Sequence, residues 1–215
     1  IRRIGMDDSD MLRIIQEFPK GAKGFILLIL KILTEKTPPT KELVDAVKKV
    51  YKDRVNDARF LIPVLSGLTK EETISLLPKL VALPASHVKT TLTRLLHNKP
   101  TPISPAELLI ALHLLDTKRD NIPLKRVLEA TQLCFDQPVV CKRGVLAVVL
   151  QQLVDKVPIP PLFMRTVIQS LSRVDQMRPF IINTILSRLV TKKVWEDARI
   201  WQGFVMACAM SLPYA

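Results

Sequence analysis

Apolar residues recur every three or four positions along nearly the whole chain, and no segment shows the strict alternation of a half-buried strand. The chain has 16 prolines and only 6 glycines, a balance that disfavours tight β-turns and suits helices separated by stiff connections. No Asn-Gly or Asp-Gly hairpin turn is present. The sequence therefore predicts an all-α fold.

Several helices carry start signals. Thr40 can cap a helix over residues 41–52, and a short helix is expected around 59–65. Thr69 is placed as the next N-cap, with Glu72 at the capping-box position, and Ser104-Pro105 combines an N-cap with proline at the first helical position. Pro78 is expected to bend or shorten the helix that follows Thr69. Towards the C-terminus, helices are expected over residues 105–115, 123–135, 139–154, 161–173, 177–190 and 199–212.

The apolar pattern also suggests how the helices are layered. Residues 25–33 and 145–153 are apolar on more than one face and are expected to be buried on most sides, whereas residues 44–52 and 165–173 are one-sided. Inner and outer layers of this kind are typical of stacked helical hairpins. We expect a HEAT-like α-solenoid of stacked antiparallel helix pairs, forming a single domain over 1–215 of a longer protein. A globular helical bundle is the alternative.

The chain is strongly basic, with 32 Lys and Arg against 20 Asp and Glu, a net charge of +12 and a pI near 9.8. Such a surplus favours acidic partners such as RNA, DNA, anionic membranes or acidic protein surfaces. No run of five like charges occurs, and the longest acid-free stretch covers residues 73–106. That stretch contains no aromatic residue, which argues against a repeat protein that stacks one base per repeat. A nucleic-acid surface and a solvated basic face both remain open.

Candidate reactive residues are few. His113 lies three residues before Asp116, which could form the orienting half of a catalytic triad, but a single histidine in an apolar stripe is more often a satisfied core residue. Cys134, Cys141 and Cys208 lack metal-ligand spacing and do not suggest a disulfide framework. We expect no enzyme, no cofactor and no metal. No signal peptide or membrane segment is recognisable, so a soluble intracellular protein is expected.

Five residues are candidates for contact with a partner. Trp195 and Trp201 either seal the last helices or act as protein-binding anchors, because exposed tryptophans are common hot spots. Arg165, Arg173 and Arg188 are expected on the polar side of their helices. Such a basic ridge is either plain solvated surface or faces an acidic partner.

Several strings of the sequence resemble the C-terminal domain of the symplekin family, and the resemblance extends over about residues 10–206. The strings are FPKGAKGF at 18–25, ATQLCF at 130–135, VLAVVLQQL at 145–153, PIPPLFMRTVIQSL at 158–171 and KVW at 193–195.

This resemblance implies a non-enzymatic, HEAT-type scaffold in the nuclear machinery that cleaves pre-mRNA 3′ ends, both for polyadenylation and for histone transcripts. It implies two partners, the cleavage endonuclease and its inactive paralogue, both subunits of the cleavage and polyadenylation specificity factor. It also implies a location in the nucleoplasm, with no membrane and no small-molecule substrate. The family offers no short site motif, so the five contact residues rest on physical arguments alone. The alternative function is a basic α-solenoid that makes weak electrostatic contact with RNA phosphates.

Overall fold

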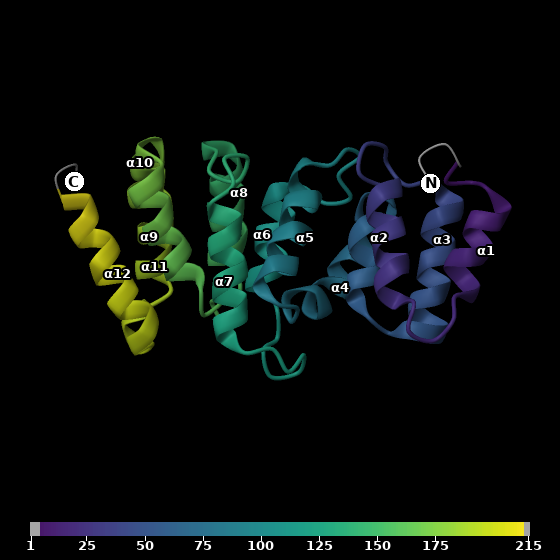
Figure 1. Cartoon of the computed structure of the whole chain (residues 1–215). Coiled ribbons are helices and arrows are strands. Elements are labelled where there is room, and N and C mark those ends of the chain that lie inside the picture. Colours follow the sequence, from purple (N-terminus) through teal and green to yellow (C-terminus); the bar gives the residue numbers. More distant parts are fainter. Residues whose placement is uncertain (1–4, 213–215) are drawn as a thin grey trace. The chain divides into compact units, whose positions relative to one another are not determined.

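A computed structural model describes residues 5–212 of the chain, and all regular structure in that range is helical (Figure 1). The predicted all-α class is therefore confirmed for the described residues. The Cα positions cluster into two compact units, Ile1–Ser104 and Pro105–Ala215, which are described separately below. Within each unit most helices pack against elements close to them in sequence, which is compatible with stacked helix pairs. The solenoid and the single domain remain predictions.

Unit 1 contains five α-helices, one π-helix and one 3₁₀-helix. They are α1 (Ser9–Glu17), α2 (Lys23–Leu33), α3 (Lys41–Val50), the π-helix η1 (Tyr51–Val55), the 3₁₀-helix η2 (Ala58–Gly67), α4 (Lys70–Val81) and α5 (Ala85–His97).

The 3₁₀-helix η2 forms the centre of unit 1. Helices α2, α3, α4 and α5 all pack against it, and Phe60, Leu61 and Leu65 are fully buried. A 3₁₀ run of ten residues is long for this helix type. The hydrogen-bond geometry of a 3₁₀-helix is poorer than that of an α-helix. Burial of the apolar side chains of η2 stabilises the segment despite this.

The expected helix starts in unit 1 are confirmed. The Thr40 hydroxyl accepts a hydrogen bond from the Leu43 amide, and Thr69 with Glu72 forms a complete capping box. Pro78 does not shorten α4, which continues to Val81. Proline has no amide hydrogen and therefore removes one backbone hydrogen bond from the helix. Pro78 lies three residues before the end of α4, so this bond is lost near the C-terminal end of the helix.

Helix α2 differs from the prediction. Its inner face consists of Ile26, Ile29, Leu30 and Leu33, but the side chains of Phe25 and Leu28 are 59% and 53% exposed. The expectation that this helix is buried on most sides is therefore wrong. Helix α2 packs against η2, and its opposite side displays large apolar groups to solvent.

Unit 2 contains the remaining helices. They are α6 (Pro105–His113), α7 (Leu124–Phe135), α8 (Arg143–Val154), α9 (Phe163–Arg173), the 3₁₀-helix η3 (Asp175–Met177), α10 (Arg178–Phe180), the π-helix η4 (Ile181–Leu186), α11 (Ser187–Thr191), the 3₁₀-helix η5 (Val194–Glu196) and α12 (Ala198–Ser211).

The helix predicted over 139–154 begins later than expected, at Arg143. A turn precedes it, in which the Val140 amide donates to the Gln137 carbonyl and the Cys141 thiol donates to the Phe135 carbonyl, at 3.0 Å each. Val140 is fully buried in this turn. Val140 therefore fits the apolar pattern of a helix, but it is buried as part of a turn.

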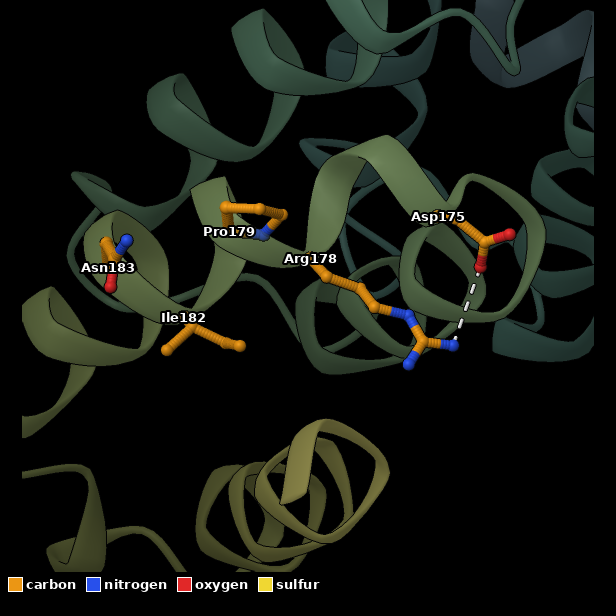
Figure 2. Close-up of a pocket in the computed structure, with 5 residues that line it drawn as sticks. All are labelled: Asp175, Arg178, Pro179, Ile182 and Asn183. Atoms are coloured by element: carbon orange, nitrogen blue, oxygen red, sulfur yellow. Dashed lines mark hydrogen bonds and ion pairs between the residues drawn. The ribbon is translucent and has the colours of Figure 1, made fainter. Parts of the chain in front are cut away.

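The segment predicted as one helix over 177–190 is helical but not uniform. Helices α10, η4 and α11 follow one another without a break, and the middle six residues are π-helical. A pocket of about 340 Å³ lies beside this segment, lined by Asp175, Arg178, Pro179, Ile182 and Asn183 (Figure 2). Arg178 forms an ion pair with Asp175 at 3.5 Å at one end of the pocket.

Candidate functional site

The terminal helix α12 packs against α9 through small residues. Gly203, Ala207 and Ser211 recur every four positions and therefore share one face of the helix. Ala207 and Ser211 are buried, and a Cβ built at Gly203 would lie 2.5 Å from the Cβ atom of Met164 on α9. The two helix backbones can approach this closely because position 203 has no side chain.

The opposite face of α12 carries large apolar side chains. Trp201, Val205 and Leu212 are 41%, 48% and 70% exposed, and their spacing places them on one side of the helix. The Trp201 ring stacks on Phe204, with ring centroids 5.4 Å apart. Among the described residues, α12 packs mainly against α9, with further contacts to η4 and η5 (Figure 1). We call Trp201, Val205 and Leu212 the α12 outer face.

A second apolar feature lies at the start of α12. Trp195, in η5, is 51% exposed, and Val157 in the loop before α9 is 90% exposed. A pocket of about 360 Å³ lies between that loop and η5, and Lys156, Lys192 and Lys193 are among its lining residues. Both tryptophans are therefore partly exposed at the surface.

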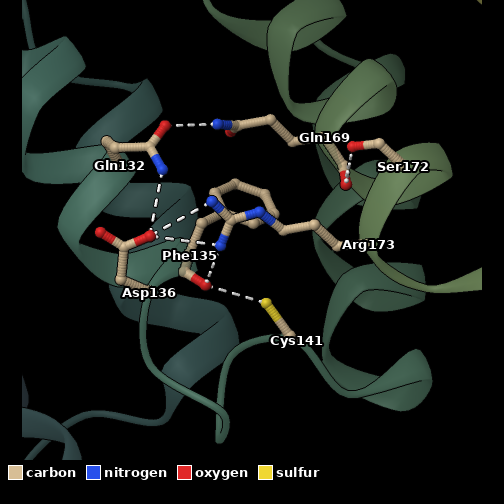
Figure 3. Close-up of polar contacts among 7 residues, drawn as sticks. All are labelled: Gln132, Phe135, Asp136, Cys141, Gln169, Ser172 and Arg173. Carbon is tan, nitrogen blue, oxygen red and sulfur yellow. Dashed lines mark hydrogen bonds and ion pairs between the residues drawn. The ribbon is translucent and has the colours of Figure 1, made fainter.

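Arg173 is bound within its own chain. Its guanidinium group donates to the Phe135 carbonyl at 2.7 Å, pairs with Asp136 at 3.2 Å and lies over the Phe135 ring (Figure 3). Asp136 also accepts a hydrogen bond from Gln132, which in turn accepts one from Gln169. This network joins the C-terminal end of α7 to α9, so Arg173 binds its own chain.

We predict that Arg173→Met lowers the free energy of unfolding by about 1 kcal/mol, because the Phe135 carbonyl at the end of α7 loses a charged donor and Asp136 loses its counter-ion. Urea denaturation followed by circular dichroism measures the change. Arg165→Met on the same helix is the matched control and should change stability by less than about 0.5 kcal/mol. Equal losses in the two variants would show that the network contributes no stability.

The other two arginines lie at the surface. Arg188 forms an ion pair with Asp155 at 3.0 Å, and both side chains are about half exposed. Arg165 is exposed on α9 and makes no hydrogen bond or ion pair with the described residues. Of the three candidate arginines, Arg165 is thus the one whose charge the described part of the chain leaves available.

His113 and Asp116, the pair considered from the sequence as part of a catalytic triad, have separate hydrogen-bond partners. His113 is buried, with Nδ1 2.7 Å from the Leu109 carbonyl and Nε2 2.7 Å from the Thr166 hydroxyl. Asp116 instead accepts hydrogen bonds from the amides of Lys118 and Arg119. The His113–Asp116 pair is therefore not formed.

The three cysteines are free thiols, and burial raises the pKa of Cys134 to about 12. Within residues 5–212, no three His, Cys, Asp or Glu side chains gather in a way that could hold a metal ion. The helices in this range are also too short or too polar to cross a membrane.

Sequence reasoning found the two tryptophans but missed the rest of the α12 outer face. Val205 and Leu212 look like core residues when only their hydrophobicity is considered. The available signal was the four-residue spacing of Gly203, Ala207 and Ser211, which indicates the face where another helix comes close.

Residues 5–212 are all-helical, and their last helix packs through small residues and displays large apolar ones, a surface typical of helical proteins that bind other proteins. A protein-family model described as "Symplekin tight junction protein C terminal" matches residues 57–215. The chain belongs to this symplekin C-terminal family. No solved structure matches it.

Membership of the family has a direct functional consequence. Symplekin is a scaffold rather than a catalytic enzyme, and the family indicates a scaffolding role in mRNA 3′-end processing, a nuclear activity. The matched range includes all of unit 2 and the part of unit 1 that begins with η2.

Proposed function

We propose that the chain is a scaffold domain of the pre-mRNA 3′-end cleavage machinery, acting for polyadenylation and for histone transcripts, and that it holds the cleavage endonuclease and its inactive paralogue. Both are subunits of the cleavage and polyadenylation specificity factor. The observation that supports this most directly is the α12 outer face, a row of large apolar side chains on a family scaffold. We further propose the nucleoplasm as the location.

The proposed contact surface is centred on Trp201 and Trp195. Tryptophan contributes a large apolar area at low entropic cost and is the residue most enriched at interface hot spots. Arg165, Arg173 and Arg188 are proposed at the polar rim. Because Arg173 and Arg188 are already bound to Asp136 and Asp155, Arg165 is expected to contribute most of the charge that a partner senses.

The test is co-purification of the 215-residue chain with the C-terminal regions of the two nuclease subunits. Trp195→Ala combined with Trp201→Ala should reduce capture by more than about tenfold, since each anchor contributes on the order of 1–2 kcal/mol. Leu114→Ala combined with Leu124→Ala is the matched control, because these leucines are 47% and 44% exposed elsewhere in unit 2. The control should capture both subunits as wild type does.

Two results would contradict the proposal. If wild-type protein captures neither nuclease subunit, the partner assignment is wrong. If capture is intact after loss of both tryptophans, the partner assignment holds but the surface lies elsewhere.

A second candidate function, weak contact with RNA phosphates, is supported by the net charge of +12. A salt titration separates it from protein binding, because affinity for generic RNA should fall steeply as salt rises. Binding of RNA without capture of either nuclease subunit would favour this function.

A further inference from the structure

Three acid-free stretches of the sequence come together in unit 1. Residues 18–34, 58–70 and 73–106 contain no Asp or Glu. Helices α2, η2 and α5 lie within these stretches, and both α2 and α5 pack against η2. The fold thus assembles one surface whose own elements supply lysine, arginine and histidine but no carboxylate.

A pocket of about 210 Å³ lies on this surface, between α2 and α5 above η2. Its lining residues are Leu27, Lys31, Arg59, Ile62, Pro63, His87, Thr90 and Arg94. Ile62 and Pro63 are buried and provide an apolar floor, whereas Lys31 and Thr90 are exposed. We call this pocket the α2–α5 groove.

The charges of the groove are unevenly neutralised. Arg59 is bound by Asp57 through several hydrogen bonds, the shortest 2.6 Å, so its charge is compensated. Arg94 is half-buried, and its guanidinium group is fixed by hydrogen bonds to the Pro63 carbonyl and the Thr34 hydroxyl. Lys31 makes no hydrogen bond or ion pair with the described residues.

Burial lowers the pKa of Arg94, and the charge of Glu35 opposes this effect. A positioned arginine next to an unpaired lysine leaves the groove with a net positive charge. An incoming carboxylate would be attracted to both groups.

Apolar side chains continue from the groove along α2. Leu27 lines the pocket, while Leu28 and Phe25 are 53% and 59% exposed on the solvent side of the same helix. A phosphate backbone would use the two cations but would bury no leucine. A protein segment with apolar residues on one face and carboxylates beside them would use both, which is how amphipathic helices bind apolar grooves.

We propose that the α2–α5 groove binds an acidic amphipathic helix of a partner protein, with one apolar side chain in the pocket and carboxylates at Lys31 and Arg94. This site lies in unit 1 and does not depend on the proposed function of the α12 outer face.

The test uses a fluorescein-labelled peptide of about four helical turns, with leucine on one face and glutamate or aspartate at the other positions. Fluorescence anisotropy measures its binding to the 215-residue chain at about 50 and about 300 mM salt. Lys31→Glu combined with Thr90→Glu reverses the charge of the rim without touching a buried residue. The matched control, Lys41→Glu with Lys52→Gln, changes the net charge equally at exposed positions that do not line the groove.

The proposal expects the peptide to bind, the groove variant to bind at least about tenfold more weakly, and the control to behave as wild type. A peptide with serine in place of leucine should also bind more weakly. Three results would overturn the proposal: no binding of the acidic peptide, equal losses in both variants, or stronger binding of a uridine oligonucleotide that is itself lost in the groove variant. The last result would identify the surface as an RNA site.

Discussion

Gly203→Leu is expected to lower the free energy of unfolding by about 2–3 kcal/mol, the usual cost of forcing extra atoms into a packed contact. A Cβ at this position would lie 2.5 Å from Met164 Cβ and 2.9 Å from its Cγ. The Cβ atom of Met164 is fixed to the backbone of α9, so a change of side-chain rotamer cannot relieve the contact. Helices α9 and α12 must therefore move apart.

The matched control for this prediction is Gly144→Leu. Gly144 also lies in a helix of unit 2, and a Cβ there meets nothing within 4 Å. The same substitution there should be neutral or stabilise the helix by up to about 0.8 kcal/mol, because leucine is the better helix former. Urea denaturation compares the two variants, and equal stability would show that the α9–α12 contact is not tight.

The same variant also tests the α12 outer face. If α12 shifts, Trp201 and Val205 shift with it, although neither residue has been changed. Gly203→Leu should therefore weaken capture of the nuclease subunits, whereas Gly144→Leu should not.

The second large effect concerns pH. The stability of unit 2 is expected to fall as pH decreases below 6.5, because burial lowers the pKa of His113 from its ordinary value of 6.5. Well above pH 6.5 the imidazole is neutral in both folded and unfolded states, and His113 contributes no pH dependence to stability. Below it the unfolded chain binds a proton that the folded chain does not, so unfolding is favoured by up to about 1.4 kcal/mol per pH unit, until the folded pKa is reached.

Burial favours the neutral form of His113, although the nearby Leu109 and Leu162 carbonyls oppose it by raising the pKa. The Leu109 carbonyl can only accept, so Nδ1 carries the proton and Nε2 accepts a hydrogen bond from the Thr166 hydroxyl. Both ring nitrogens are thus satisfied without a positive charge, and a proton added at Nε2 would place a charge in an apolar core.

Urea denaturation between pH 8 and pH 5 measures this dependence. The range stays above the ordinary pKa values of Asp and Glu, 3.8 and 4.5, and the pKa values of Asp57, Glu72, Asp116 and Asp197 are lowered further. His113→Gln should be less stable overall but should lose much of the slope below pH 6.5. An unchanged slope in this variant would assign the pH dependence to another group.

Local signals predicted much of the fold. The capping box at Thr69, the N-cap at Thr40 and the proline at the start of α6 depend on neighbours within one turn, and all three lie where the sequence placed them. The 3₁₀ form of η2 and the π-helical turns of η4 were not foreseen. Both forms depend on which distant helices pack around the segment, and hydrophobic periodicity carries no information about those helices.

The site was predicted less completely. Trp195 and Trp201 stood out as rare, large residues, and both are exposed as an anchor requires. Arg173 was expected on a polar ridge, either solvated or facing a partner, and its contacts with Asp136 and the Phe135 carbonyl across the α7–α9 contact were not foreseen. A side chain on the polar face of its own helix can still form hydrogen bonds with residues of a neighbouring helix.

The sequence by itself determined that this chain is helical, where most helices begin and end, and to which family it belongs, because these properties follow from local periodicity, capping and residue identity. Only the tertiary structure decided which apolar faces stay uncovered. Hydrophobicity shows that a side chain gains free energy on burial, but whether a neighbour is present to bury it depends on contacts between distant segments. Trp201, Leu28 and Phe25 remain exposed because the described helices pack against the other faces of α12 and α2.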